Sequence, residues 1–143
     1  MKKTFFLPAL FLVLLVISCN KKDSTMSKTQ LLTSGSWRLT AVVSDNDANG
    51  TYETDDFAGF PDCFKGNYYT FFSNGSAELN EGPTKCDPMD PQTETATWQF
   101  TQNETHLKID TDEWKLEELT ASTLKWKEEY AGGRSALVTF TKR

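Results

Sequence analysis

An acidic loop carries the residues whose spacing is most specific for chemistry. Asp45, Asp47 and Asn49 alternate along it, Gly50 follows them, and Asp56 takes the twelfth position. Oxygen ligands at positions one, three, five and twelve, with glycine at six, are the spacing of a calcium-binding loop. The predicted calcium ligands are Asp45, Asp47, Asn49, Thr51 through its carbonyl oxygen, Glu53 through a water, and Asp56.

A polar turn is the alternative for this loop. Position twelve is Asp56 rather than the longer Glu that binds calcium with both oxygens. The residues before the loop alternate like a strand, whereas such a calcium loop follows a helix. Asn49 and Gly50 also favour a tight turn without any ion. From the sequence, both interpretations stay open.

Motifs of common enzymes are missing from the sequence. It has no Gly-x-Ser-x-Gly nucleophile motif, no glycine-rich phosphate loop and no His-Glu-x-x-His zinc motif. His106 is the single histidine, and no partner stands at a spacing that would make it a catalytic base. Glu117, Glu118, Glu128 and Glu129 are expected on solvated strand faces or turns. We therefore expect no enzymatic activity.

The N-terminal residues indicate export. Lys2 and Lys3 precede an apolar run over residues 5–17, which is the layout of a secretory signal. The run is shorter than the about 20 residues that a membrane-spanning helix needs. Residues 1–18 are therefore predicted to be a signal peptide.

The signal ends in residues that resemble the lipobox of bacterial lipoproteins, Val16-Ile17-Ser18-Cys19. The resemblance implies that Cys19 receives lipid and becomes the mature N-terminus; an ordinary signal peptide is the alternative. By the same resemblance, Asn20 is compatible with sorting to an outer membrane. We expect a lipid-anchored protein in the cell envelope of a Gram-negative-type bacterium, facing the periplasm or the cell surface. Residues 19–30 are polar and are predicted to form a flexible tether.

Cys63 and Cys86 remain once Cys19 carries lipid. An even number of cysteines in an oxidising compartment favours a disulfide between them. Zinc binding is the alternative, but a cysteine pair with a single histidine falls short of a zinc ligand set. The chain has 20 acidic and 15 basic residues and a net charge of -5. A nucleic acid is therefore not an expected partner, because phosphate contacts need clustered Lys and Arg.

Residues 31–143 are long enough for one domain, and apolar and polar residues alternate there in short segments separated by turns. This pattern predicts an all-β domain, a small antiparallel up-and-down barrel of about eight strands, after a helical turn over residues 27–33. A two-sheet sandwich is the alternative. One face carries Trp37, Leu39, Ala41 and Val43; Trp98 and Phe100; Leu107 and Ile109; Trp114 and Leu116; Leu124, Trp126, Glu128 and Tyr130; and Ala136, Val138 and Phe140.

One hairpin can be predicted in register. If Tyr69 and Phe71 share a face with Ala77 and Leu79, then Phe71 lies opposite Ala77. The loop then has three residues and ends at Gly75 in the left-handed conformation. Continued outward, this register brings the two cysteines close together at the base of the hairpin.

Gly35-Ser36-Trp37 resembles the Gly-x-Trp signature of lipocalins, whose tryptophan plugs one end of the barrel. With Cys63, the Tyr69-Thr70-Phe71 hairpin, Cys86-Asp87-Pro88 and Trp98, residues 31–141 look like the lipocalin-like domain family of predicted bacterial lipoproteins. The resemblance implies a small barrel whose lumen holds an apolar ligand.

Function then depends on whether the barrel is hollow. The predicted ligand-lining residues are Trp37, Tyr69, Phe71, Trp98, Phe100, Trp114, Trp126, Tyr130 and Phe140. These favour a lipid-anchored binding module for a small apolar molecule. The alternative is a packed core and a domain that recognises a protein or glycan. Phe57, Phe60 and Phe64 could cap the barrel mouth or form a contact patch.

Overall fold

The structure, a computed structural model, describes residues 26–143; the predicted signal peptide, Cys19 and most of the predicted tether lie outside the described residues. The elements are α1 Lys28–Leu32, β1 Ser36–Asp45, β2 Thr54–Asp55, the 3-10 helix η1 Phe57–Gly59, α2 Asp62–Lys65, β3 Tyr68–Phe71, β4 Ser76–Asn80, β5 Thr93–Thr101, β6 His106–Ile109, β7 Asp112–Leu119, β8 Thr123–Glu129, the 3-10 helix η2 Ala131–Gly133 and β9 Ser135–Lys142. No helix in this part of the chain is long and apolar enough to cross a membrane.

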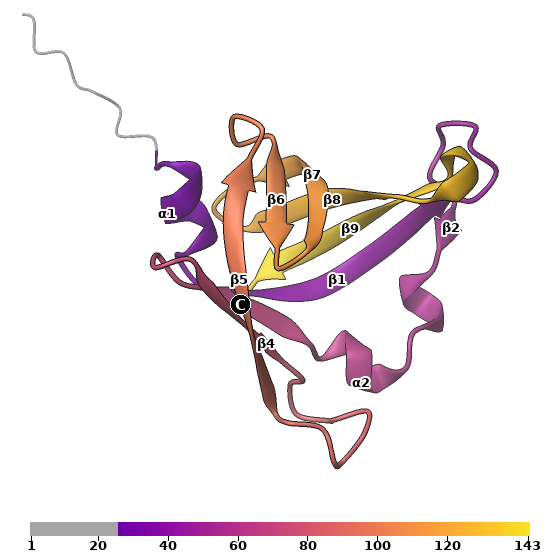
Figure 1. The fold of residues 1–143 in the computed structure, drawn as a ribbon. Helices are drawn as coiled ribbons and strands as arrows, with labels where there is room; N and C mark the ends of the chain where they lie inside the picture. The colour runs from indigo at the N-terminus through magenta and orange to yellow at the C-terminus, as the bar shows by residue number, and fades with distance from the viewer. Residues whose placement is uncertain (1–25) are drawn as a thin grey trace, which may run out of the picture.

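The strands form one antiparallel sheet that closes on itself (Figure 1). Its order is β2-β1-β3-β4-β5-β6-β7-β8-β9, and β1 also pairs with β9. The ring therefore follows the chain order from β3 to β9 and is closed by β1, while the two-residue β2 extends one edge of β1. The predicted all-β up-and-down barrel is confirmed.

The core follows the predicted alternation on most strands. Inward-facing side chains of β6, β8 and β9 are buried because the pleat turns every second residue toward the barrel axis. The buried apolar residues are Leu32, Trp37, Val42, Phe71, Ala77, Trp98, Leu107, Ile109, Leu124, Trp126, Ala136, Val138 and Phe140. Aromatic residues from several strands meet among them, so one continuous core holds the ring together.

Strand β1 departs from its prediction. Its pairing with β9 shifts between Leu39 and Ala41, as in a β-bulge, and this shift reverses which residues face inward. Val42 and Ser44 are buried, whereas Val43 is only partly buried. The prediction that Ala41 and Val43 share the inner face with Trp37 is therefore wrong.

The β3–β4 hairpin has the predicted register. Phe71 lies opposite Ala77, and Gly75 has a φ of 85°, which a residue without a side chain adopts without strain. The indole of Trp98 on β5 donates to the carbonyl of Phe72 at 2.9 Å. The turn is therefore fastened to the neighbouring strand.

Helix α1 closes one end of the barrel. A capping box starts it: the Ser27 hydroxyl accepts from the N–H of Gln30 at 3.1 Å, and the Gln30 side chain accepts from the N–H of Ser27 at 2.8 Å. Leu32 and Trp37 are fully buried, and the Trp37 indole donates to the Leu32 carbonyl at 2.7 Å. The helical turn predicted over residues 27–33 is confirmed, and it begins at Lys28, within the range predicted as tether.

Candidate ligand pocket

A gap in the strand pairing opens the barrel wall beside β1. Strand β1 pairs with β3 over residues 36–38 and with β2 at residues 43–44. Between these two pairings, η1 and α2 contact β1; Phe60 follows η1, and Phe64 lies in α2. Short helices therefore replace a strand in this part of the wall.

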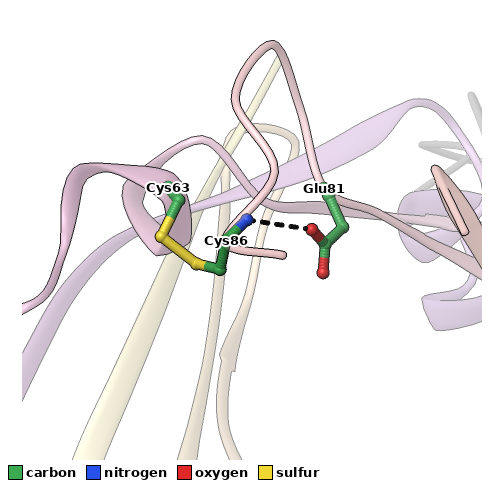
Figure 2. Close-up of a disulfide and its surroundings, with 3 residues drawn as sticks. All are labelled: Cys63, Glu81 and Cys86. Carbon is green, nitrogen blue, oxygen red and sulfur yellow. Dashed lines mark hydrogen bonds between the residues drawn. A yellow bond between two sulfur atoms is a disulfide. The ribbon is translucent and has the colours of Figure 1, made fainter. Parts of the chain in front are cut away.

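A disulfide between Cys63 of α2 and Cys86 of the β4–β5 loop fixes this segment (Figure 2). The two Cα atoms lie 5.2 Å apart, and the Cys86 N–H donates to the Glu81 carboxylate at 3.3 Å. Close by, the backbone at Gly82 has a φ of 69° and passes so near Gly66 that a Cβ on Gly82 would collide with the Gly66 carbonyl. The predicted disulfide is confirmed, and it holds two segments in tight contact.

A pocket of about 340 Å³ opens inside the barrel next to α2. Its lining residues are Leu39, Val42, Phe60, Phe64, Asn67, Tyr69, Leu79, Trp114, Trp126, Glu128, Tyr130, Val138 and Phe140. Five of the predicted ligand-lining residues are therefore brought together: Tyr69, Trp114, Trp126, Tyr130 and Phe140. Phe60 and Phe64, which the sequence suggested as a cap, form part of the wall.

The other four predicted lining residues lie outside the pocket. Phe71, Trp98 and Phe100 pack edge to face in series, with ring centroids 5.8 and 5.5 Å apart. Trp37 lies under α1. The interior is therefore filled around these side chains and hollow beside α2.

Aromatic contacts organise the hollow part. The rings of Trp114 and Trp126 stack with centroids 4.9 Å apart and an interplanar angle of 11°. Phe140 lies 4.4 Å from Trp126, and Tyr69 meets both of these rings edge-on at 5.9 and 6.3 Å. These contacts link β3, β7, β8 and β9, so the strands themselves position the pocket lining.

Glu128 supplies the carboxylate of the pocket. It accepts from the Trp126 indole at 3.1 Å and from the Tyr130 hydroxyl at 2.7 Å. Burial and Glu128 together raise the pKa of Tyr130 to about 12. Burial, followed by the charge of Glu128, also raises the pKa of Tyr69. The prediction that Glu128 lies on a solvated face is wrong, because its side chain is half-buried and lines the pocket.

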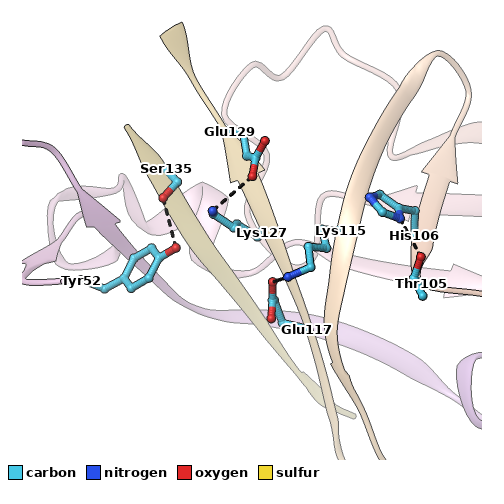
Figure 3. A network of polar contacts seen from close by, with 8 residues as sticks. All are labelled: Tyr52, Thr105, His106, Lys115, Glu117, Lys127, Glu129 and Ser135. Atoms are coloured by element: carbon cyan, nitrogen blue, oxygen red, sulfur yellow. Dashed lines mark hydrogen bonds and ion pairs between the residues drawn. The ribbon is translucent and has the colours of Figure 1, made fainter. Parts of the chain in front are cut away.

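A polar hollow of about 260 Å³ adjoins the pocket, and Trp114, Glu128 and Tyr130 line both. Its remaining walls are His106, Asp112, Glu113, Lys115, Lys127 and Glu129. Figure 3 shows part of this surface, where Lys127 pairs with Glu129 at 3.1 Å and Lys115 pairs with Glu117 at 2.8 Å. A molecule in the apolar pocket would therefore meet a polar, charged surface next to Glu128.

The predicted calcium loop is held together by its own hydrogen bonds. The buried carboxylate of Asp45 accepts from the N–H groups of Asn49 at 3.0 Å and Gly50 at 2.9 Å. Burial alone would raise the pKa of Asp45, but these N–H groups outweigh it and hold the pKa below its usual range. The carboxylate of Asp56 accepts a hydrogen bond from the Ser44 hydroxyl.

The other predicted calcium ligands also take part in the local structure. Asp47 accepts from the Asn49 amide at 2.9 Å, the N–H of Thr51 donates to Asn49 at 2.7 Å, and the N–H of Glu53 donates to the Ser44 carbonyl. Over residues 26–143, no group of three or more His, Cys, Asp or Glu side chains is arranged to hold a metal ion. Calcium binding stays a prediction.

Sequence reasoning missed several pocket residues: Leu39, Val42, Asn67, Leu79, Glu128 and Val138. The signal for Glu128 was present, because it shares an alternating strand face with Leu124 and Trp126. Val42 was misplaced by the bulge. Asn67 follows α2, and nothing in its local sequence separates it from an ordinary loop asparagine.

Comparison with known proteins agrees with this architecture. Residues 33–126 match the lipocalin-like domain family. The fold is similar to that of a DUF4847 family protein from Bacteroides vulgatus, at a TM-score of 0.53 and 13% identity over 82% of this chain and 98% of the other. A lipocalin-like protein from Bacteroides uniformis matches at a TM-score of 0.44 and 20% identity, over 79% and 99% of the two chains. The comparison with curated proteins gave no match. The family match covers more than half of the sequence, and the chain thus belongs to the lipocalin-like domain family.

Proposed function

We propose that the protein is a lipid-anchored binding module of the bacterial cell envelope that holds a small apolar ligand in its barrel. The observation that carries the proposal is the aromatic pocket of about 340 Å³. Small-molecule sites are mostly apolar, contain a few placed polar groups and measure about 300–1,000 Å³. The pocket lies at the low end of that range, so the proposal is for one small molecule rather than a large lipid. The role is binding, without a catalytic step.

The anchoring part of the proposal rests on the lipobox-like residues around Cys19 and on the position of α1. Figure 1 shows α1 and α2 on opposite sides of the barrel. A tether that enters through α1 would leave the α2 side, where the pocket lies, free for a ligand. The rival role, an interaction domain without a cavity, has less support because part of the interior is hollow.

Neighbouring valines on β1 provide a matched test of ligand binding. Val42 is buried and lines the pocket, whereas Val43 is next to it on the strand and outside the lining. With pyrene as a neutral apolar probe, we expect Val42→Phe to weaken binding at least about tenfold by filling the pocket, and Val43→Phe to bind like wild type. Quenching of tryptophan emission measures the affinity. Equal binding by wild type and Val42→Phe, or none by either, would refute this role.

Anchoring is tested separately by labelling cells with radioactive palmitate. The wild-type chain should incorporate label and sediment with membranes, whereas Cys19→Ser should do neither. Label in Cys19→Ser, or its absence from wild type, would show that the anchor is wrong while leaving the pocket in place.

A further inference from the structure

Glu128 is a carboxylate without a basic partner. Within residues 26–143, the ion pairs are Lys65–Asp62, Lys115–Glu117, Lys125–Glu118 and Lys127–Glu129. Glu128 instead accepts one hydrogen bond on each oxygen, from Trp126 and Tyr130. An ionised carboxylate has about four lone-pair sites, so it can accept further donors. The two existing bonds hold its oxygens at the junction of the apolar pocket and the polar hollow.

The surroundings of this carboxylate favour positive charge. Five aromatic side chains line the same pocket, and an aromatic face that is open to it attracts cations: Tyr69, Trp114, Trp126, Tyr130 and Phe140. The carboxylates of Asp112, Glu113 and Glu129 lie around the adjoining hollow. Lys115 and Lys127 also border it, but each is paired with a glutamate; His106 bonds to the neighbouring Thr105 hydroxyl. Burial is the largest cause of the raised pKa of Tyr69, and the negative charges of Glu128, Asp112, Glu94 and Asp110 raise it further.

We infer that the pocket selects an apolar molecule that carries one protonated amine. Its apolar body fills the aromatic chamber, and its ammonium group donates to the free lone pairs of Glu128 at the junction with the polar hollow. This inference rests on the proposed function and narrows it, because it gives the ligand a charge and an orientation. A carboxylate of the same shape would be repelled, and a neutral alcohol would keep a hydrogen bond to Glu128 but lack the attraction between opposite charges.

Three probes of one shape test the inference: phenylbutylamine, phenylbutanol and phenylbutanoate. Each is titrated calorimetrically into the purified protein against a detergent-matched blank. For wild type we expect the amine to bind at least about tenfold tighter than the alcohol, because both can donate to Glu128 but only the ammonium adds the attraction between opposite charges. The carboxylate should bind weakest.

Glu128→Gln and Glu118→Gln are matched variants, since each removes one negative charge from a strand. Glu118 pairs with Lys125 on the surface and lies outside the lining of both hollows. Glu128→Gln should lose the preference for the amine over the alcohol, whereas Glu118→Gln should keep the wild-type preference.

The outcomes separate the two proposals. Equal affinity of wild type for amine and alcohol, or a preference that survives in Glu128→Gln, would overturn the amine assignment while leaving a working apolar pocket. A preference lost equally in both variants would show a general charge effect and also overturn it. If pyrene and all three probes fail to bind wild type, the proposed function itself falls.

Discussion

Tyr130 follows the last residue of β8 and holds its hydroxyl against Glu128. Burial and this contact raise its pKa from 10.0 to about 12. The unfolded chain therefore loses the phenolic proton first as pH rises, so the native state binds more protons between these two values. The stabilisation is fully present below pH 10.0 and is lost as pH rises toward about 12.

The expected result is a free energy of unfolding that falls more steeply over this interval for wild type than for Tyr130→Phe. Denaturant unfolding at several pH values measures both chains. Tyr69 and Lys127, whose pKa values are also raised, are present in both and cancel in the difference. Parallel curves for the two proteins would show that Tyr130 contributes nothing to the pH dependence.

At the scale of single residues, the sequence predicted which aromatic side chains face the interior better than it predicted what surrounds them there. Tyr69, Trp126 and Phe140 were expected to line a cavity, and they do, because they occupy inward-facing positions of their alternating strands. Phe71 and Trp98 have the same pattern but are packed against each other. Only the curvature of the closed sheet decides which inward rings touch and which leave space.

Among the elements, α1 covers the end of the barrel whose interior is filled by side chains. Leu32→Ala removes a fully buried side chain beside Trp37 and should lower the free energy of unfolding by about 2–5 kcal/mol. Leu31→Ala, in the same helix but only partly buried, should cost less. Urea unfolding measures the difference. Since Leu32 is outside the pocket lining, affinity for pyrene should be unchanged in the folded variant; loss of binding would contradict the separation of the two ends.

The crossing of Gly66 and Gly82 is a second element-scale constraint. Gly82→Ala places a Cβ against the Gly66 carbonyl at a φ of 69°, so we expect a loss of about 1–3 kcal/mol. Gly59→Ala is the control, because Gly59 has open space around its Cβ position. Thermal unfolding compares the two variants. Similar melting temperatures for the two variants would show that the backbone segments at Gly66 and Gly82 can move apart without loss of stability.

Element order and the β3–β4 turn could be predicted because apolar alternation and glycine act locally. The bulge in β1 could not, since it is a mismatch between β1 and β9, which are far apart in sequence. The short helices η1 and α2 were likewise missed as wall elements. Their sequence is too short to show a helical period, and their position depends on the gap beside β1.

For the whole molecule, the disulfide is the covalent link between the α2 segment and the β4–β5 loop. It spans 23 residues, and restricting the unfolded chain over that distance contributes about 3 kcal/mol. The variant Cys63→Ser with Cys86→Ser should lose about that amount in urea unfolding. Wild-type protein treated with a reductant should lose the same amount of stability. If the double variant were as stable as wild type, the disulfide would not restrict the unfolded chain.

Barrel closure was predictable because a meander of alternating strands leaves exposed edges unless it closes. The pocket was not, because its volume depends on how η1 and α2 cover the gap and on the bulge that turns Val42 inward.

The position of Cys63 in α2 couples reduction of the disulfide to ligand binding in the pocket. Phe64, its neighbour in α2, lines the pocket, so loosening of α2 after reduction would also weaken the binding of a ligand there. Suppose that a ligand in contact with Phe64 binds the oxidised protein more tightly than the reduced protein. Thermodynamic reciprocity then requires that this ligand make the disulfide harder to reduce by the same factor. The disulfide would therefore resist reduction by thiols better with a ligand bound than without one. The reduction potential of the compartment would in turn affect how tightly the barrel binds its ligand.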